Sequence, residues 1–154
     1  LDSDQQSLAT LSREKTRNYP MAAANADNKM QDFEGISGAE LSSSQRLALL
    51  EVIRTYIGNL REPHAAVTME EIAAHIDSTF FAWIGAVDDD AVFYYRVHSP
   101  VIMIEFDHQN PVGTIMLNER GIPTRDHIHT VVRTPNGNDY GKDLLAQHLA
   151  SQAH

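Results

Sequence analysis

The sequence contains no cysteine among its 154 residues. This absence excludes disulfide bonds, thiolate metal ligands and cysteine nucleophiles, and it gives no indication of the redox compartment. Localisation therefore stays unknown from composition. The start at Leu1 rather than methionine favours a processed chain, secreted or extracytoplasmic, or a piece of a longer protein.

Long apolar runs and basic clusters are absent as well. No segment approaches the roughly 20 apolar residues that a membrane-spanning helix needs. The formal net charge is −9, with 12 Lys and Arg against 21 Asp and Glu. Because nucleic acids attract basic surfaces, we expect neither a nucleic acid nor a membrane as a partner. The 42% hydrophobic content is typical of a globular domain.

Several motifs of large enzyme families are also missing. The chain has no glycine-rich phosphate loop, no G-x-S-x-G and no H-E-x-x-H. Histidine, by contrast, is abundant, with eight in the chain. Histidines combined with carboxylates and arginines are therefore the candidate functional residues.

The pattern of apolar residues predicts two parts. Residues 1–34 show little apolar periodicity and are expected to form a loosely ordered N-terminal segment and linker. Residues 35–154 are expected to form an α+β domain, in which an antiparallel β meander of about four strands packs against helices. The expected helices cover 41–60, 63–77 and 140–150, and the expected strands cover 80–86, 91–98, 101–108 and 126–133.

The register between two of these strands depends on the turn at residues 99–100. A two-residue turn pairs Tyr94 with Glu105 and Arg96 with Met103. Directly paired residues point to the same face of a sheet, so Tyr94, Arg96 and Glu105 are expected to share one face. His98 falls on the same face and is a further candidate ligand.

His127 and His129 occupy alternate positions of the last expected strand and therefore share a face. Two imidazoles side by side can bind one cation, and Glu105 on a neighbouring strand supplies a third ligand. Zinc is the first expectation, and iron or copper is the alternative. In the competing interpretation the histidines only form hydrogen bonds and Glu105 pairs with Arg96. Both interpretations hold if Glu105 binds the metal and also pairs with Arg96.

A series of short motifs resembles the Domain of Unknown Function 3500 family over about residues 35–149. The motifs are Phe93-Tyr94-Tyr95-Arg96, Ile104-Glu105-Phe106-Asp107, His127-Ile128-His129-Thr130, Arg133, Asn138-Asp139-Tyr140-Gly141 and Leu144-Leu145. The resemblance implies a chain equivalent to the C-terminal half of a protein about twice as long, completed by an N-terminal half or by a second chain. It supports as site residues Glu105, His127, His129, Arg96, Arg133, Asp139 and His148, whereas His98 falls where the family varies.

Two functions are compatible with these residues. In the first, the chain is the metal-binding domain of a metal-dependent hydrolase or oxidoreductase acting on an unknown small molecule. Glu105 is then a ligand or a base, and Arg96 and Arg133 stabilise developing negative charge. In the second, the chain is a non-catalytic binding or interaction module that uses the same Arg, His and Glu face.

Overall fold

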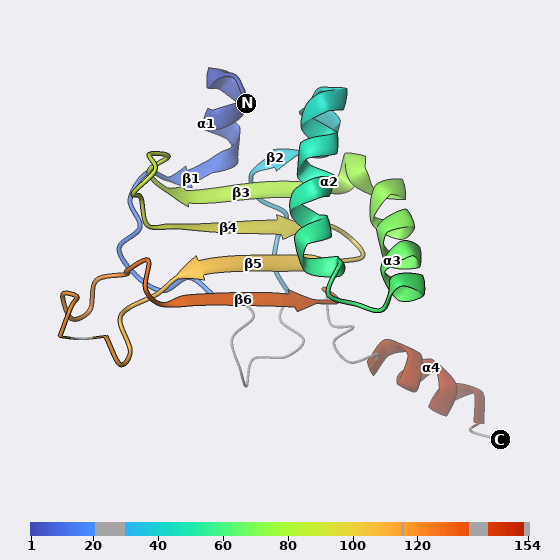
Figure 1. Cartoon of the computed structure of the whole chain (residues 1–154). Coiled ribbons are helices and arrows are strands. Elements are labelled where there is room, and N and C mark those ends of the chain that lie inside the picture. Colours follow the sequence, from blue (N-terminus) through green and yellow to red (C-terminus); the bar gives the residue numbers. More distant parts are fainter. Residues whose placement is uncertain (21–29, 115, 136–141, 153–154) are drawn as a thin grey trace.

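A six-stranded mixed β-sheet forms the centre of the molecule in the computed structural model, which describes residues 1–20, 30–114, 116–135 and 142–152 (Figure 1). The strands follow the order β1-β3-β4-β5-β6, and β2 also pairs with β3. The strands are β1 (Thr10–Ser12), β2 (Ile36–Ser37), β3 (Phe80–Gly85), β4 (Phe93–His98), β5 (Met103–His108) and β6 (Ile128–Arg133). The helices are α1 (Ser3–Ala9), α2 (Ser43–Ile57), α3 (Glu62–Ala74) and α4 (Lys142–Gln152), with short 3-10 turns at Gly38–Glu40 and Ile76–Ser78.

Strands β3 to β6 form an antiparallel meander, which confirms the predicted α+β fold. Two strands from the first 37 residues extend it: β1 runs parallel to the second half of β3, and β2 runs antiparallel to its first half. The N-terminal region thus contributes to the same sheet as the meander. None of the helices in the described ranges is long and apolar enough to span a bilayer.

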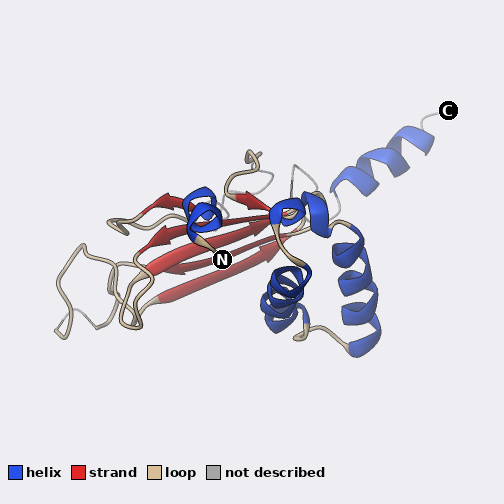
Figure 2. Cartoon of the chain, turned by 90° about the horizontal axis from the view of Figure 1, so that it is seen from above, coloured by secondary structure: helices blue, strands red, loops and turns tan. Residues whose placement is uncertain are grey.

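Helix α2 begins at Ser43, within the predicted range 41–60. The Ser42 side chain accepts from the Gln45 backbone N–H, and the Gln45 side chain accepts from the Ser42 backbone, so the capping box is complete. Leu49, Ile53 and Ile57 follow at helical spacing and are buried. Figure 2 shows α2 and α3 on the same side of the sheet, where they form the apolar core with strands β4 and β5.

The predicted two-residue turn between β4 and β5 is wrong. Arg96 pairs with Glu105 and His98 pairs with Met103, so residues 99–102 form the turn. The Ser99 backbone N–H donates to the Ile102 carbonyl at 2.9 Å, and the Ser99 hydroxyl accepts from the Ile102 backbone N–H at 3.1 Å. These bonds favour the longer turn. Because the register shifts by two residues, every side chain stays on its predicted face.

The sheet therefore has two chemically different faces. The helix face carries an aromatic row and is covered in part by α2 and α3; its members include Phe81, Trp83, Phe93, Tyr95 and Phe106. The polar face carries Tyr94, Arg96, His98, Glu105, Asp107, His129 and Arg133. Residues 15–19 and 33–34 lie over this polar face, where they contact Asp107, Tyr94, Arg96 and His98.

Candidate functional site

Glu105 lies at the centre of a buried hydrogen-bond network. Its side chain is 1% exposed, and the Tyr94 hydroxyl donates to Glu105 Oε1 at 2.7 Å. Arg96 Nη1 donates to the Tyr94 hydroxyl at 3.4 Å, and Arg96 Nη2 forms an ion pair with Glu34 Oε2 at 2.6 Å. Burial and the nearby Glu105 carboxylate raise the pKa of Tyr94 above its usual range. Tyr94 therefore remains a proton donor that links Arg96 to Glu105.

Asp107 is the next acidic residue on the polar face, and both of its carboxylate oxygens have polar partners. Lys15 Nζ lies 3.0 Å from Asp107 Oδ1, and both side chains are buried. Asp107 Oδ2 accepts from the Tyr19 backbone N–H at 3.0 Å and from Gln109 Nε2 at 2.9 Å. These contacts of Asp107 could not be predicted from the sequence, because Lys15 and Tyr19 lie in a segment without apolar periodicity.

His98 is buried at the far end of β4. Its ring packs against Phe33 at 4.4 Å between ring centroids. Burial, together with the positive charge of Arg96, lowers the pKa of His98 to about 4. His98 pairs with Met103, whereas His129 pairs with Asp107 at the opposite end of β5. The structure therefore separates His98 from the predicted histidine pair.

His127 and His129 come together as predicted. Their Nε2 atoms lie 3.1 Å apart, and their rings are almost perpendicular, at 87°. His127 Nδ1 is 2.6 Å from the Asn110 carbonyl oxygen. Because a carbonyl only accepts, His127 Nδ1 donates to it, which leaves Nε2 of the neutral His127 ring to accept a hydrogen bond from His129 Nε2–H. His127 is half-buried and His129 is exposed, so the pair is open to solvent.

Glu105 stands apart from the histidine pair. In the register of β5 and β6, Asp107 lies opposite His129, and Glu105 lies opposite Val131, roughly 7 Å further along the strand. Over the described residues, no group of three or more His, Cys, Asp or Glu side chains is arranged to hold a metal ion. The structure thus brings the two histidines together and ties Glu105 to Tyr94.

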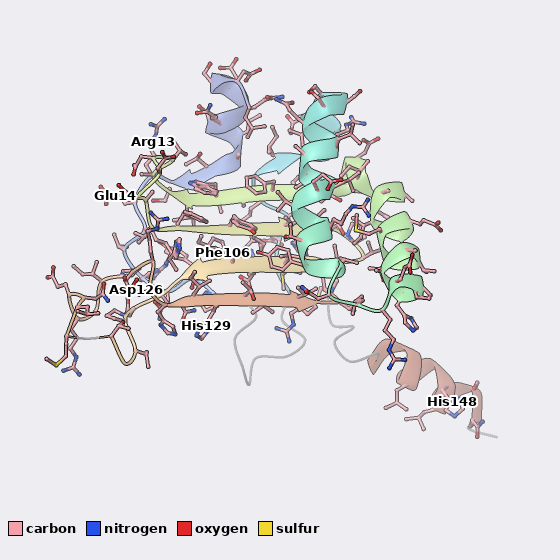
Figure 3. The ribbon with its side chains drawn as sticks, in the orientation of Figure 1. Arg13, Glu14, Phe106, Asp126, His129 and His148 are labelled. Atoms are coloured by element: carbon pink, nitrogen blue, oxygen red, sulfur yellow. The ribbon has the colours of Figure 1, made fainter. Side chains whose placement is uncertain are left out.

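The remaining predicted residues are spread along and beyond β6. Arg133 lies on the polar face opposite Met103, at the other end of β6 from His129. Figure 3 shows His129 at the left end of β6 and His148 on α4, past the right end of the strand. Asp139 lies outside the described residues. Neither Arg133 nor His148 therefore stands beside the histidine pair.

Fold and site together define an α+β protein with an antiparallel meander, a buried ionic polar face and a solvent-exposed histidine pair at one end of that face. The chain belongs to the family described as Protein of unknown function (DUF3500), whose model matches residues 1–142. This match confirms the predicted family resemblance, covers residues 35–142 of the predicted range and extends it through the N-terminal segment. No curated protein and no solved structure matches the chain.

Proposed function

We propose that this chain is the metal-binding domain of a metal-dependent hydrolase or oxidoreductase, with a divalent transition metal held between His127 and His129. The observation that carries the proposal is the 3.1 Å separation of their Nε2 atoms. Two nitrogen ligands of a tetrahedral zinc ion, each at about 2.0–2.1 Å, lie roughly 3.3 Å apart. The observed spacing is therefore close to that of two zinc ligands.

The hydrogen bond from His127 Nδ1 to the Asn110 carbonyl supports this assignment. Histidines that bind metals commonly donate their second ring N–H to a carbonyl or carboxylate, which fixes the tautomer and the direction of the free lone pair. Imidazole ligands suit zinc, iron and copper, and zinc is our first choice. A bound zinc ion would activate water for hydrolysis.

Glu105 enters the proposal in one of two ways. As a third ligand it has to exchange the Tyr94 hydroxyl for the metal and move toward His129. As a fixed residue it keeps its bond to Tyr94 and helps to set the shape and charge of the polar face. The geometry favours the second role, because Glu105 is 1% exposed and His129 is on the surface. Water or substrate then completes the coordination, together with ligands from an N-terminal half or a second chain.

Arg96 and Arg133 receive different roles because they differ in burial and in their position on the polar face. Arg96 is 3% exposed and forms an ion pair with Glu34, so it stabilises the polar face from within. Arg133 is half-buried and lies on β6, the strand that also carries His129. We assign to Arg133 the binding of a negatively charged part of the substrate.

Elemental analysis of the chain, purified without chelator and then loaded with zinc, iron or copper, tests the proposal. The parent chain is expected to retain metal, and His127→Ala and His129→Ala are expected to lose it. His64→Ala, a change at an exposed histidine of α3, is the matched control and keeps the metal. A parent chain that binds none of the three metals overturns the proposal. Loss of metal in Glu105→Gln with the fold intact assigns Glu105 as a ligand.

A binding or interaction module is the second candidate, and β6 supplies its supporting observation. Among the described strands, β6 pairs only with β5, so no described strand covers its other edge. Ile128 and Val132 on this strand are 45% and 46% exposed. An edge of this kind accepts an added strand. We propose that an N-terminal half or a second chain of this family pairs there.

Light scattering tests this second candidate on the purified chain alone and after mixing with a separately produced N-terminal half. A complex that Ile128→Lys and Val132→Lys disrupt supports it. A chain that stays monomeric in both experiments, or a complex that tolerates both lysines, contradicts it.

A further inference from the structure

A groove on the helix face, between α1 and β3, is independent of the histidine pair. Its volume is about 340 Å³, and its walls are mainly apolar, formed by Leu1, Ala9, Thr10, Phe81, Trp83 and Phe93. A pocket of this size is within the range that binds small molecules. The histidine pair lies on the other face of the sheet, so the groove belongs to a different site.

One wall of the groove is the end of an aromatic row that crosses three strands. Phe106 of β5 and Tyr95 of β4 have ring centroids 5.3 Å apart and planes within 2° of parallel. Tyr95 and Trp83 of β3 follow at 6.3 Å and 5°. These separations are those of offset-stacked rings. The rings therefore stand in a ladder that follows the strand order.

The position after Trp83 in this ladder is Thr10, its register partner on β1. Thr10 has no ring, and the groove lies over Thr10 and the neighbouring Ala9. Phe93 and Tyr95 of β4 contact Trp83 from one side, at 4.5 Å and 6.3 Å between centroids. Phe81, two residues before Trp83 on β3, also contacts it at 6.4 Å between centroids and lines the groove. Trp83 lines the groove as well, and on the β1 side its register partner Thr10 supplies no fourth ring.

Trp83 is held in this orientation by its own hydrogen bonds. The indole Nε1–H lies 3.1 Å from the Gly85 carbonyl oxygen and 3.3 Å from the Ala86 carbonyl oxygen, and it donates to both. The ring is therefore fixed before any ligand arrives. A fixed ring loses little conformational entropy on binding, which favours affinity.

The other end of the ladder differs in one respect. Phe106 pairs with Thr130 of β6, so a threonine also follows the last ring there. Thr130 is exposed on the outer strand, whereas α1 and Leu1 close the space over Thr10 into a groove. Among the described residues, the Thr10 end combines a ladder position without a ring with a groove lined by α1 and Leu1.

A second hollow of about 350 Å³ adjoins the groove and shares Gln6, Thr10, Val87 and Asp88 with it. Arg13, labelled beside the end of β3 in Figure 3, also lines this hollow. The guanidinium of Arg13 donates hydrogen bonds, and the carboxylate of Asp88 accepts them. A ligand that occupies both spaces therefore has a flat apolar part and a part with hydrogen-bond donors and acceptors.

We propose that this groove binds a small molecule with an aromatic or heteroaromatic ring, which stacks on Trp83 as the fourth member of the ladder. Its polar substituents lie in the adjoining hollow beside Arg13 and Asp88.

Fluorescence provides the test, because Trp83 is the single tryptophan of the chain. The probes are adenosine, phenol and cyclohexanol, each titrated into the full chain with excitation selective for tryptophan. Adenosine and phenol are expected to change the Trp83 emission saturably. Cyclohexanol resembles phenol in size and hydroxyl group but has no aromatic ring, and it is expected to cause no saturable change.

Two matched variants locate the site. Thr10→Phe places a ring of the protein itself in the vacant position and is expected to weaken adenosine binding at least about tenfold. Thr130→Phe adds a ring at the other end of the ladder and is expected to leave binding unchanged. Circular dichroism checks that both variants fold.

Three results overturn the proposal. The first is the absence of saturable binding by both aromatic probes. The second is equal binding by the parent chain and a folded Thr10→Phe variant. The third is a dimer of the parent chain that Thr10→Phe dissociates, because a second copy is then the occupant of the groove.

Discussion

Lys15 Nζ lies 3.0 Å from Asp107 Oδ1, in an ion pair whose two side chains are 0% and 1% exposed. This pair joins the N-terminal segment to β5 across the polar face. Removing one member of a buried pair leaves the other charge without compensation in a low-dielectric environment. We therefore expect Lys15→Met to lower the free energy of unfolding by about 3–5 kcal/mol, measured by urea denaturation.

Arg125→Met is the control for this prediction. Arg125 pairs with Asp90 at 3.1 Å, but their side chains are 52% and 101% exposed. A solvent-exposed pair contributes at most about 1 kcal/mol. Equal effects of the two substitutions would contradict the assignment of Lys15 as a buried structural cation.

Tyr94→Phe tests the buried donor to Glu105. The substitution keeps the ring and removes the hydroxyl that donates to Glu105 and accepts from Arg96. A loss of about 1–3 kcal/mol in unfolding free energy is expected, because a buried acceptor loses its donor. Metal content measured on the same sample should equal that of the parent chain, since His127 and His129 are unchanged. A stability within about 0.5 kcal/mol of the parent would rule out this role.

The stability of the chain is expected to fall below about pH 6.5. His98 has a pKa of about 4 in the folded chain, whereas an unfolded histidine has about 6.5. Between these values the unfolded chain binds more protons, so unfolding becomes easier as the pH falls. The groups that face His98 include Arg96, Glu34 and Phe33. The effect is about 3 kcal/mol at most, at ~1.4 kcal/mol per pKa unit.

His98→Leu separates this effect from the remaining titrations. Denaturant unfolding between pH 4 and pH 7 should show a smaller slope with pH for the variant than for the parent. Burial also lowers the pKa of His108, which contributes a slope of the same sign, so a part of the dependence persists. Identical slopes for parent and variant would show that His98 does not contribute.

Comparing Gly35→Ala with Gly113→Ala tests how tightly the segment before β2 packs on β3. Gly35 and Gly113 both have a positive φ, of 95° and 76°. A Cβ at Gly35 lies 2.1 Å from the Phe81 carbonyl oxygen, whereas a Cβ at Gly113 has no atom within 4 Å. Both alanine variants carry the cost of the left-handed backbone, about 1–2 kcal/mol. Gly35→Ala is expected to cost at least about 2 kcal/mol more, and thermal unfolding measures the difference.

Much of the fold followed from local patterns. The apolar spacing over residues 41–60 predicted a helix, which the structure contains as α2, Ser43–Ile57. The β4–β5 turn was predicted two residues too short, because the Ser99 hydrogen bonds that select the longer turn depend on local geometry. The faces were predicted correctly despite this error, since strand side chains alternate with a period of two.

The candidate site was predictable only where its members are close in sequence. His127 directly precedes β6 and His129 is the second residue of that strand, and the structure brings their Nε2 atoms together. The partners of Asp107 and Arg96 are Lys15, Tyr19 and Glu34, which lie 62 to 92 residues away in the sequence. Such contacts depend on how the N-terminal segment crosses the sheet, and a single sequence carries no local signal for that path.

The parallel pairing of β1 with β3 gives the fold a high contact order. During synthesis Thr10 leaves the ribosome long before its partner Trp83, and Lys15 precedes Asp107 by an even longer stretch of chain. Closing such loops costs entropy before the contacts form, and this slows folding. We therefore expect the N-terminal segment to dock after the meander has formed, so that the charged residues of β4 and β5 remain in water until then.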